Sequence, residues 1–254
     1  MWTRDVDAYL REVFPSVEGW CVPHLWQAIQ PLREAMAREG DLGPAAEIGV
    51  YHGKFFIGLV KTLGSASGNA AIDVFDLQRF NLDRAGEGDL AAFRANLARA
   101  GVAEEAVSIR RADSMTLGPA EIEALRPEGG GYSLFSVDGC HLAAHTVNDI
   151  RVAMALTRPQ GLIFVDDYYN PSWPGVQEGV AKLYLMDAPR FVPLVYLCNK
   201  LILCHVSYHA PYFRALREFL PARFPKTQIK AVQRFGQPTL TVAPVLGEPR
   251  YLAL

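Results

Sequence analysis

The sequence predicts an α/β fold built on a doubly wound, mostly parallel sheet, with an antiparallel hairpin near the carboxyl end. From Ala45 onward, short apolar runs alternate with helical patterns, which is typical of repeated strand-helix-strand units. Two of these runs end in acids, at Asp138 and at Asp166-Asp167. After residue 186 the pattern changes, and two apolar runs flank residues 198–200 at a spacing that suits a tight hairpin.

The first forty residues are predicted to form helices that pack before the sheet begins. Apolar residues at 25, 26, 29, 32 and 36 recur at helical spacing, and the stretch from Gly40 to Pro44 ends that pattern. We therefore divide the chain into a helical segment over 1–43, which is a candidate lid, and a main domain over 44–254.

The elements of the main domain follow from the alternation of apolar runs and helical patterns. Right-handed crossovers between parallel strands would place the helices on both faces of the sheet. Strands are predicted over 46–50, 71–75, 107–110, 132–137 and 162–165, and helices over 54–63, 89–99, 145–155 and 175–186. The hairpin strands at 191–197 and 201–206, a helix at 212–220 and an extended pair at 229–234 and 239–243 complete the chain.

The composition indicates a globular protein that acts on small molecules. Of the 254 residues, 50% are hydrophobic and 20% are charged, which supplies enough apolar surface for a core. The net charge of -2, without a block of like charges, predicts no nucleic-acid or membrane partner. The four cysteines form no Cys-x-x-Cys pair, and neither a signal-like start nor a membrane span is evident, so we expect a cytoplasmic location.

The acids that follow two neighbouring strands predict a metal site. The carboxyl ends of parallel strands meet at one crevice, which brings Asp138, Asp166 and Asp167 together. Three such carboxylates repel one another unless protons or a cation intervene, and oxygen ligands suit Mg²⁺, Ca²⁺ or Mn²⁺. Two structural alternatives stay open: Asp138 only ends a strand, and Asp166 or Asp167 caps the next helix.

The first strand-to-helix turn predicts a nucleoside site without a phosphate cradle. Gly49 and Gly53 permit a tight turn, but the spacing matches neither the dinucleotide fingerprint nor the phosphate-binding loop. Asp76 follows the second predicted strand, where a carboxylate can accept hydrogen bonds from both ribose hydroxyls. This combination fits S-adenosylmethionine, whose sulfonium and amino-acid tail replace a pyrophosphate.

These residues resemble the class I S-adenosylmethionine-dependent methyltransferases, in particular the metal-dependent small-molecule O-methyltransferases of the catechol and macrocin types. The resemblance runs from about Glu47 to Val180 and implies a Rossmann-like sheet. Glu47-x-Gly49-x-x-x-Gly53 resembles the first motif of the family, and Ala112-Asp113-Ser114 resembles the segment beside the adenine. The stretch from Pro171 to Val176 resembles a Trp-Pro-Gly-Val segment of the sugar-modifying enzymes.

The resemblance also implies roles for individual residues. His141 lies where the catechol enzymes have a lysine base, and Asp167 lies where they have an asparagine, so the sugar-type enzymes are more similar. With a reference pKa of ~6.5, His141 would be mostly neutral and able to take the acceptor proton; the alternative is an ordinary polar residue. The implied cofactor-binding residues are Glu47, Gly49, Gly53, Asp76, Asp113, Ser114 and Asp138, and the implied metal ligands are Asp138, Asp166 and Asp167.

The functional hypothesis is an S-adenosylmethionine-dependent, Mg²⁺-dependent O-methyltransferase acting on a hydroxyl of a sugar-bearing or aromatic metabolite. Tyr168, Tyr169 and Trp173 are candidate walls for a ring-shaped acceptor, with core packing as the alternative. Two other functions stay open: a metal-independent methyltransferase, and a non-catalytic protein that binds S-adenosylmethionine. Apolar strands near the carboxyl end also suggest a homo-oligomer, most simply a dimer.

Overall fold

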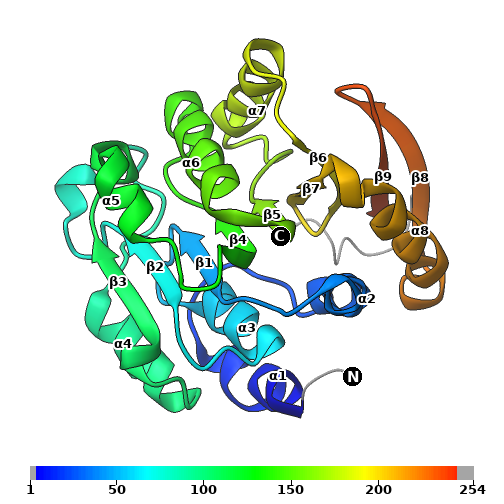
Figure 1. The fold of residues 1–254 in the computed structure, drawn as a ribbon. Helices are drawn as coiled ribbons and strands as arrows, with labels where there is room; N and C mark the ends of the chain where they lie inside the picture. The colour runs from blue at the N-terminus through cyan, green and yellow to red at the C-terminus, as the bar shows by residue number, and fades with distance from the viewer. Residues whose placement is uncertain (1–3, 245–254) are drawn as a thin grey trace.

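The protein is organised around a nine-stranded sheet in the order β3-β2-β1-β4-β5-β7-β6-β9-β8 (Figure 1). The structure is a computed structural model that describes residues 4–244. The strands are β1 (Ala45–Ile48), β2 (Asn69–Asp73), β3 (Val107–Arg111), β4 (Tyr132–Val137), β5 (Thr157–Val165), β6 (Phe191–Leu197), β7 (Lys200–His205), β8 (Thr227–Arg234) and β9 (Gln237–Pro244).

The first five strands pair in parallel, and the direction changes at β7. β5 and β7 are antiparallel, with Val165 opposite Leu201, and β6 and β7 form the expected antiparallel hairpin. β6 then pairs in parallel with β9, and β8 is antiparallel to β9 and forms the outer edge of the sheet. The predicted fold class is therefore confirmed. The pairing of subunits through apolar strands near this end stays a prediction.

Helices cover both faces of the sheet, as Figure 1 shows. One core lies between the sheet and α2, α3, α4 and α8, and a second core lies between the opposite face and α5, α6 and α7. The helix bounds are α1 (Arg4–Ala8), α2 (Leu25–Glu39), α3 (Lys54–Leu63), α4 (Leu90–Arg99), α5 (Pro119–Ala124), α6 (Ala143–Leu156), α7 (Pro174–Met186) and α8 (Val206–Arg223). No helix within residues 4–244 is both long and apolar enough to cross a membrane.

The amino-terminal segment is helical, as predicted, and packs into the first of these cores. Trp26 of α2 is buried, contacts Phe55 of α3 edge-on and donates a 3.0 Å hydrogen bond from Nε1 to Thr62 Oγ1. The Tyr9 hydroxyl donates a 2.7 Å hydrogen bond to the carbonyl of Lys54. The described part of this segment thus shares a core with the sheet. Its separate status and its role as a lid stay predictions.

Several elements differ from the predicted bounds; β5, for example, begins at Thr157 rather than at Leu162, and the differences at β2 and α8 have local reasons. β2 ends at Asp73 rather than at Phe75, because the Asp73 carboxylate accepts a 2.5 Å hydrogen bond from the Phe75 backbone N–H and Phe75 has a φ of 46°. This turn takes the chain out of the sheet before Asp76. α8 is twice as long as the helix predicted at 212–220, since it continues through two prolines.

Gly49 follows β1 directly and lies close to the backbone of Asp138, which follows β4. Its φ is 84°, and a Cβ atom at this position would lie 1.8 Å from the backbone oxygen of Asp138. The Asp138 N–H donates to the carbonyl of Ile48 at 2.8 Å, which keeps the two chains in contact beyond the strand ends. Any side chain at position 49 would therefore separate the strand ends that carry the acids.

We expect Gly49→Ala to lower the free energy of unfolding by about 3 kcal/mol or more, because it adds a backbone clash to an unfavourable φ. Gly129→Ala is the matched control: its φ is 88°, and its Cβ would meet no atom within 4 Å. That control should cost only about 1–2 kcal/mol for the left-handed conformation. Urea denaturation measures both values, and equal losses would contradict the close-approach explanation.

Candidate active site

A cavity of about 920 Å³ opens at the carboxyl ends of β1, β2, β4 and β5. Its walls also include the turn between β6 and β7 and the loop over 80–88. Of the residues predicted for the site, seven line this cavity: Gly49, Asp113, Ser114, Asp138, His141, Asp166 and Asp167. Glu47, Gly53 and Asp76 are not among its lining residues.

Asp73 is the acid that the end of β2 presents to the cavity. One carboxylate oxygen accepts the backbone N–H of Tyr51 at 2.8 Å, and the other accepts that of Phe75 at 2.5 Å. Burial raises the pKa of Asp73, and these hydrogen bonds oppose the rise by favouring the charged form. The carboxylate thus ties the turn after β1 to the end of β2 and retains lone pairs for a ligand.

Asp76 lies outside the cavity, where its carboxylate forms an exposed ion pair with Arg111. Sequence reasoning chose Asp76 because it placed the end of β2 at Phe75. The signal for Asp73 was present in the apolar run itself, as the only acid within residues 71–75. The ribose-binding role of Asp76 stays a prediction, and Asp73 is the acid at the end of β2 that lines the cavity.

Glu47 and Gly53 lie on either side of the first turn and are not among the residues that line the cavity. Glu47 is buried, and neither of its carboxylate oxygens has a hydrogen-bond partner among the described residues. Burial raises the pKa of Glu47 to about 8, so the protonated form dominates near pH 7. Gly53 precedes α3 with a φ of 87°, and a Cβ there would lie 2.6 Å from the Phe93 ring.

Asp113 and Ser114 form the far wall of the cavity, just after β3. The Asp113 carboxylate accepts the Met115 backbone N–H at 2.9 Å and so caps a short helical turn over Ser114–Thr116. Both residues line the cavity while serving this turn. Their position beside the adenine of a bound nucleoside stays a prediction.

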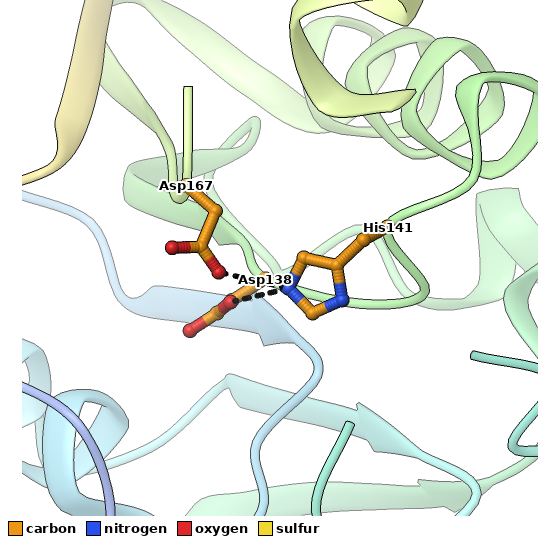
Figure 2. A group of neighbouring side chains, drawn as sticks. All are labelled: Asp138, His141 and Asp167. Atoms are coloured by element: carbon orange, nitrogen blue, oxygen red, sulfur yellow. Dashed lines mark hydrogen bonds and ion pairs between the residues drawn. The ribbon is translucent and has the colours of Figure 1, made fainter. Parts of the chain in front are cut away.

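Asp138, His141 and Asp167 point toward one another at the other end of the cavity (Figure 2). The His141 Nε2 lies 2.9 Å from Asp167 Oδ2 and 4.0 Å from Asp138 Oδ1. One ligand atom from each residue can lie within 4.8 Å of the other two. Burial and the nearby Asp166 raise the pKa of Asp138, so this carboxylate lacks sufficient positive charge around it.

Asp83, which sequence reasoning missed, fixes the orientation of His141. Its Oδ2 accepts the His141 backbone N–H at 2.6 Å and lies 2.7 Å from the ring Nδ1. Nδ1 therefore faces Asp83, Nε2 faces the cavity acids, and the ring stacks on Trp173 with centroids 4.4 Å apart. The partners are 58 residues apart in the chain, and no local pattern joins them.

The carboxylates of Asp83 and Asp167 also change the protonation of His141. Burial alone would lower the pKa, but hydrogen bonds to Asp167 and Asp83 outweigh it and raise the pKa from 6.5 to about 9. The imidazole is thus protonated near pH 7 in this structure, which differs from the neutral ring expected from its reference value. The role of His141 as the base stays a prediction.

Asp167 is held by hydrogen bonds from three sides. Besides His141, the side-chain amides of Asn170 and Asn199 both donate to its Oδ1. Burial raises its pKa, but the hydrogen bonds from His141 and Asn170 lower it more, so the carboxylate stays charged. α7 begins at Pro174 with Trp173 at its N-cap, so neither Asp166 nor Asp167 caps that helix.

Asp166 is not part of the group that faces the cavity centre. Its Oδ2 accepts a hydrogen bond from the Lys200 ammonium, and its Oδ1 accepts the Asp167 backbone N–H at 2.9 Å. Lys200 was missed as a site residue, although a lysine at the start of the apolar run 201–204 was a signal for a buried charge. The predicted trio of aspartates therefore differs from the cluster that the structure assembles.

The aromatic residues after β5 divide between wall and core. Tyr169 and Trp173 line the cavity together with Tyr196 of β6. Tyr168 is instead buried in the second core, and its hydroxyl accepts a 3.0 Å hydrogen bond from Arg234. Of the three aromatic residues, Tyr169 and Trp173 thus line the cavity as predicted, and Tyr168 belongs to the core, which was the alternative.

Comparisons with known proteins show what part of this chain is similar to. Residues 46–168 match the sequence family described as a methyltransferase domain. No curated protein sequence matches the chain at a significant level. The family match agrees with the resemblance to class I, S-adenosylmethionine-dependent methyltransferases over the part of the chain that carries the first five strands, apart from Ala45 at the start of β1.

Solved structures share this fold at low sequence identity. A candidate O-methyltransferase from Klebsiella pneumoniae is 18% identical with a TM-score of 0.52, covering 79% of this chain and 89% of its own. The TDP-rhamnose 3′-O-methyltransferase CalS11 of calicheamicin biosynthesis is 16% identical with a TM-score of 0.50, covering 78% of this chain and 86% of its own. These likenesses concern the fold.

The raised pKa of His141 gives a testable pH dependence of stability. Because its pKa is higher in the folded protein, its contribution is complete below about 6.5, the unfolded value, and is lost as the pH rises through about 9. Between pH 6.5 and pH 9 we expect the unfolding free energy of the wild type to fall by about 3 kcal/mol more than that of His141→Gln. This follows from ~1.4 kcal/mol for each unit of pKa difference between the folded and unfolded states. Urea denaturation in metal-free buffer measures it, and parallel curves for the two proteins would contradict the assignment.

Proposed function

We propose that this protein transfers the methyl group of S-adenosylmethionine to a hydroxyl of a small metabolite. One observation carries the proposal: a single cavity joins the turn at Gly49, Asp73 and Asp113 to the cluster of Asp138, His141 and Asp167. The first group suits a nucleoside and the second suits the deprotonation of an acceptor. Methyl transfer needs both, because the acceptor oxygen must lie in line with the carbon that leaves sulfur.

The donor would occupy the end of the cavity formed by β1, β2 and β3. We propose that Asp73 accepts hydrogen bonds from the ribose hydroxyls and that Asp113 and Ser114 flank the adenine. Gly49 lets the backbone approach the ligand, since it has no side chain to intervene. Asp138 follows β4 beside Gly49, so its carboxylate is placed to attract the positive sulfonium group.

The acceptor would lie between the acidic cluster and the wall of Tyr169, Trp173 and Tyr196. These rings provide a flat apolar surface for an aromatic or sugar ring. In the reaction the carbon–sulfur bond breaks, a carbon–oxygen bond forms, and the hydroxyl loses its proton. We propose that the His141 imidazolium first releases its Nε2 proton to solvent and that Nε2 then accepts the proton of the acceptor hydroxyl, while Asp83 keeps the ring oriented.

The residues present fit a divalent cation, which we propose to be Mg²⁺. Asp138 and Asp167 supply carboxylate oxygens within reach of each other, and the raised pKa of Asp138 indicates that added positive charge would be favourable. Such a cation, held by these two carboxylates, would lower the pKa of a bound hydroxyl and orient it. Asp166 was expected as a third ligand, but in this structure it pairs with Lys200.

Donor binding can be tested without knowing the acceptor. We expect calorimetric titration to show that Asp73→Asn weakens S-adenosylmethionine binding about tenfold or more, because a carboxylate acceptor for ribose is lost. Asp76→Asn is the matched control, since Asp76 lies three residues away and outside the cavity. A larger loss of affinity in Asp76→Asn than in Asp73→Asn would indicate that Asp76 binds the ribose, as the sequence pattern predicted. Absence of donor binding in the wild type would contradict the proposed function itself.

Turnover can be tested with a panel of catechols and hydroxylated sugars. We expect S-adenosylhomocysteine to form with at least one acceptor that has adjacent hydroxyls, faster with Mg²⁺ than with a chelator. His141→Gln should slow this reaction about 100-fold or more, because the proton acceptor is removed. Asp187→Asn, which alters an exposed ion pair with Arg151, should not.

The remaining outcomes distinguish the alternatives. Turnover that a chelator does not affect would favour a metal-independent methyltransferase. Donor binding without turnover of any acceptor would favour a non-catalytic protein that binds S-adenosylmethionine.

A further inference from the structure

Lys200 places a buried ammonium group at the floor of the cavity. It is the first residue of β7, follows a turn in which Cys198 and Asn199 have φ values of 49° and 67°, and its side chain is 2% exposed. The ammonium lies 4.4 Å from the centroid of the Phe55 ring and donates to Asp166 Oδ2. A charge so far from solvent requires compensation by partners of opposite sign.

The partners of Lys200 are the acids of the site. Burial alone would lower the pKa of its ammonium, but Asp166 and Asp138 raise it above the ordinary value. Glu47 is also close to the Lys200 ammonium, and this positive charge opposes the rise that burial causes in the pKa of Glu47. Lys200 is therefore a positive charge that the fold itself supplies to this set of carboxylates.

Both oxygens of Asp166 are already engaged. One accepts the Lys200 ammonium, and the other accepts the backbone N–H of Asp167 at 2.9 Å. For Asp166 to bind a metal through the oxygen that faces Lys200, it would have to give up a buried ion pair, which is strongly unfavourable. Asp138 and Asp167 bear no such pairing with a lysine.

We propose that Lys200 is the resident cation of this site: it neutralises Asp166 and leaves Asp138 and Asp167 as the carboxylates available to a divalent metal. This inference rests on the proposed function. Metal affinity rises with the number of charged ligands, so a site with two available carboxylates binds a divalent ion more weakly than one with three. When no metal is bound, Asp166 keeps its ion pair with Lys200.

The direct test is Mn²⁺ binding to wild type and to Lys200→Met, measured by electron paramagnetic resonance of the free ion. Methionine has similar length and retains contact with the Phe55 ring, but it removes the charge. We expect Lys200→Met to bind Mn²⁺ about tenfold more tightly or better, because three carboxylates then face one ion. Lys182→Met, which breaks an exposed pair with Glu178 on α7, should match the wild type.

The variant also has an expected stability signature. Without metal, Lys200→Met leaves Asp166 buried without its cation and should melt at a lower temperature than the wild type. Saturating Mn²⁺ should raise its melting temperature more than that of the wild type, because the ion takes the place of the ammonium. The double variant Lys200→Met/Asp166→Asn should bind Mn²⁺ as weakly as the wild type.

Two results would overturn the proposal. The first is equal Mn²⁺ affinity in wild type and Lys200→Met, and the second is a Lys200→Met protein that stays unfolded at saturating Mn²⁺. Calorimetry of S-adenosylmethionine on the wild type separates this inference from the proposed function. Donor binding with unchanged Mn²⁺ affinity would contradict only the role of Lys200, whereas absent donor binding would contradict the methyltransferase assignment.

Discussion

The site depends on the balance of charge at the carboxyl ends of β1, β4 and β5. Glu47, Asp138 and Asp166 are brought together there with little water around them, and carboxylates in such surroundings repel one another. The ammonium of Lys200 compensates part of this negative charge by pairing with Asp166. The imidazolium of His141 then compensates Asp167 and Asp83 at the edge of the cavity. The positions of the acids are therefore tied to the positions of these two cations.

The antiparallel part of the sheet has a function in this arrangement. The hairpin of β6 and β7 adds two strands to the parallel half, and its turn carries Asn199 and Lys200 to the acids that follow β5. Asn199 donates to Asp167 while Lys200 donates to the neighbouring Asp166. The two adjacent aspartates thus face different environments, one in the cavity and one on its floor. The hairpin is therefore part of the proposed active site as well as of the core.

The sequence was sufficient to predict the fold and the edge of the sheet at which the cavity lies. Alternation of strands and helices and the acids after two strands are local patterns, and the structure places Asp138 and Asp167 in one cavity as expected. It was not sufficient for the residues that act through distant contacts. Asp83 reaches His141 across 58 positions, and Lys200 reaches Asp166 across 34. The position of Asp76 was misjudged for another reason: an apolar run does not show where hydrogen bonding ends a strand.

The most direct test of the central claim is a crystal structure of the protein with S-adenosylhomocysteine. We expect one ligand that spans the cavity, with the ribose hydroxyls on Asp73, the adenine beside Asp113 and the sulfur facing Asp138 and His141. That result would place the departing methyl group next to the residues proposed to receive the acceptor. A ligand bound outside this cavity, or bound with its sulfur directed away from Asp138 and His141, would contradict the account.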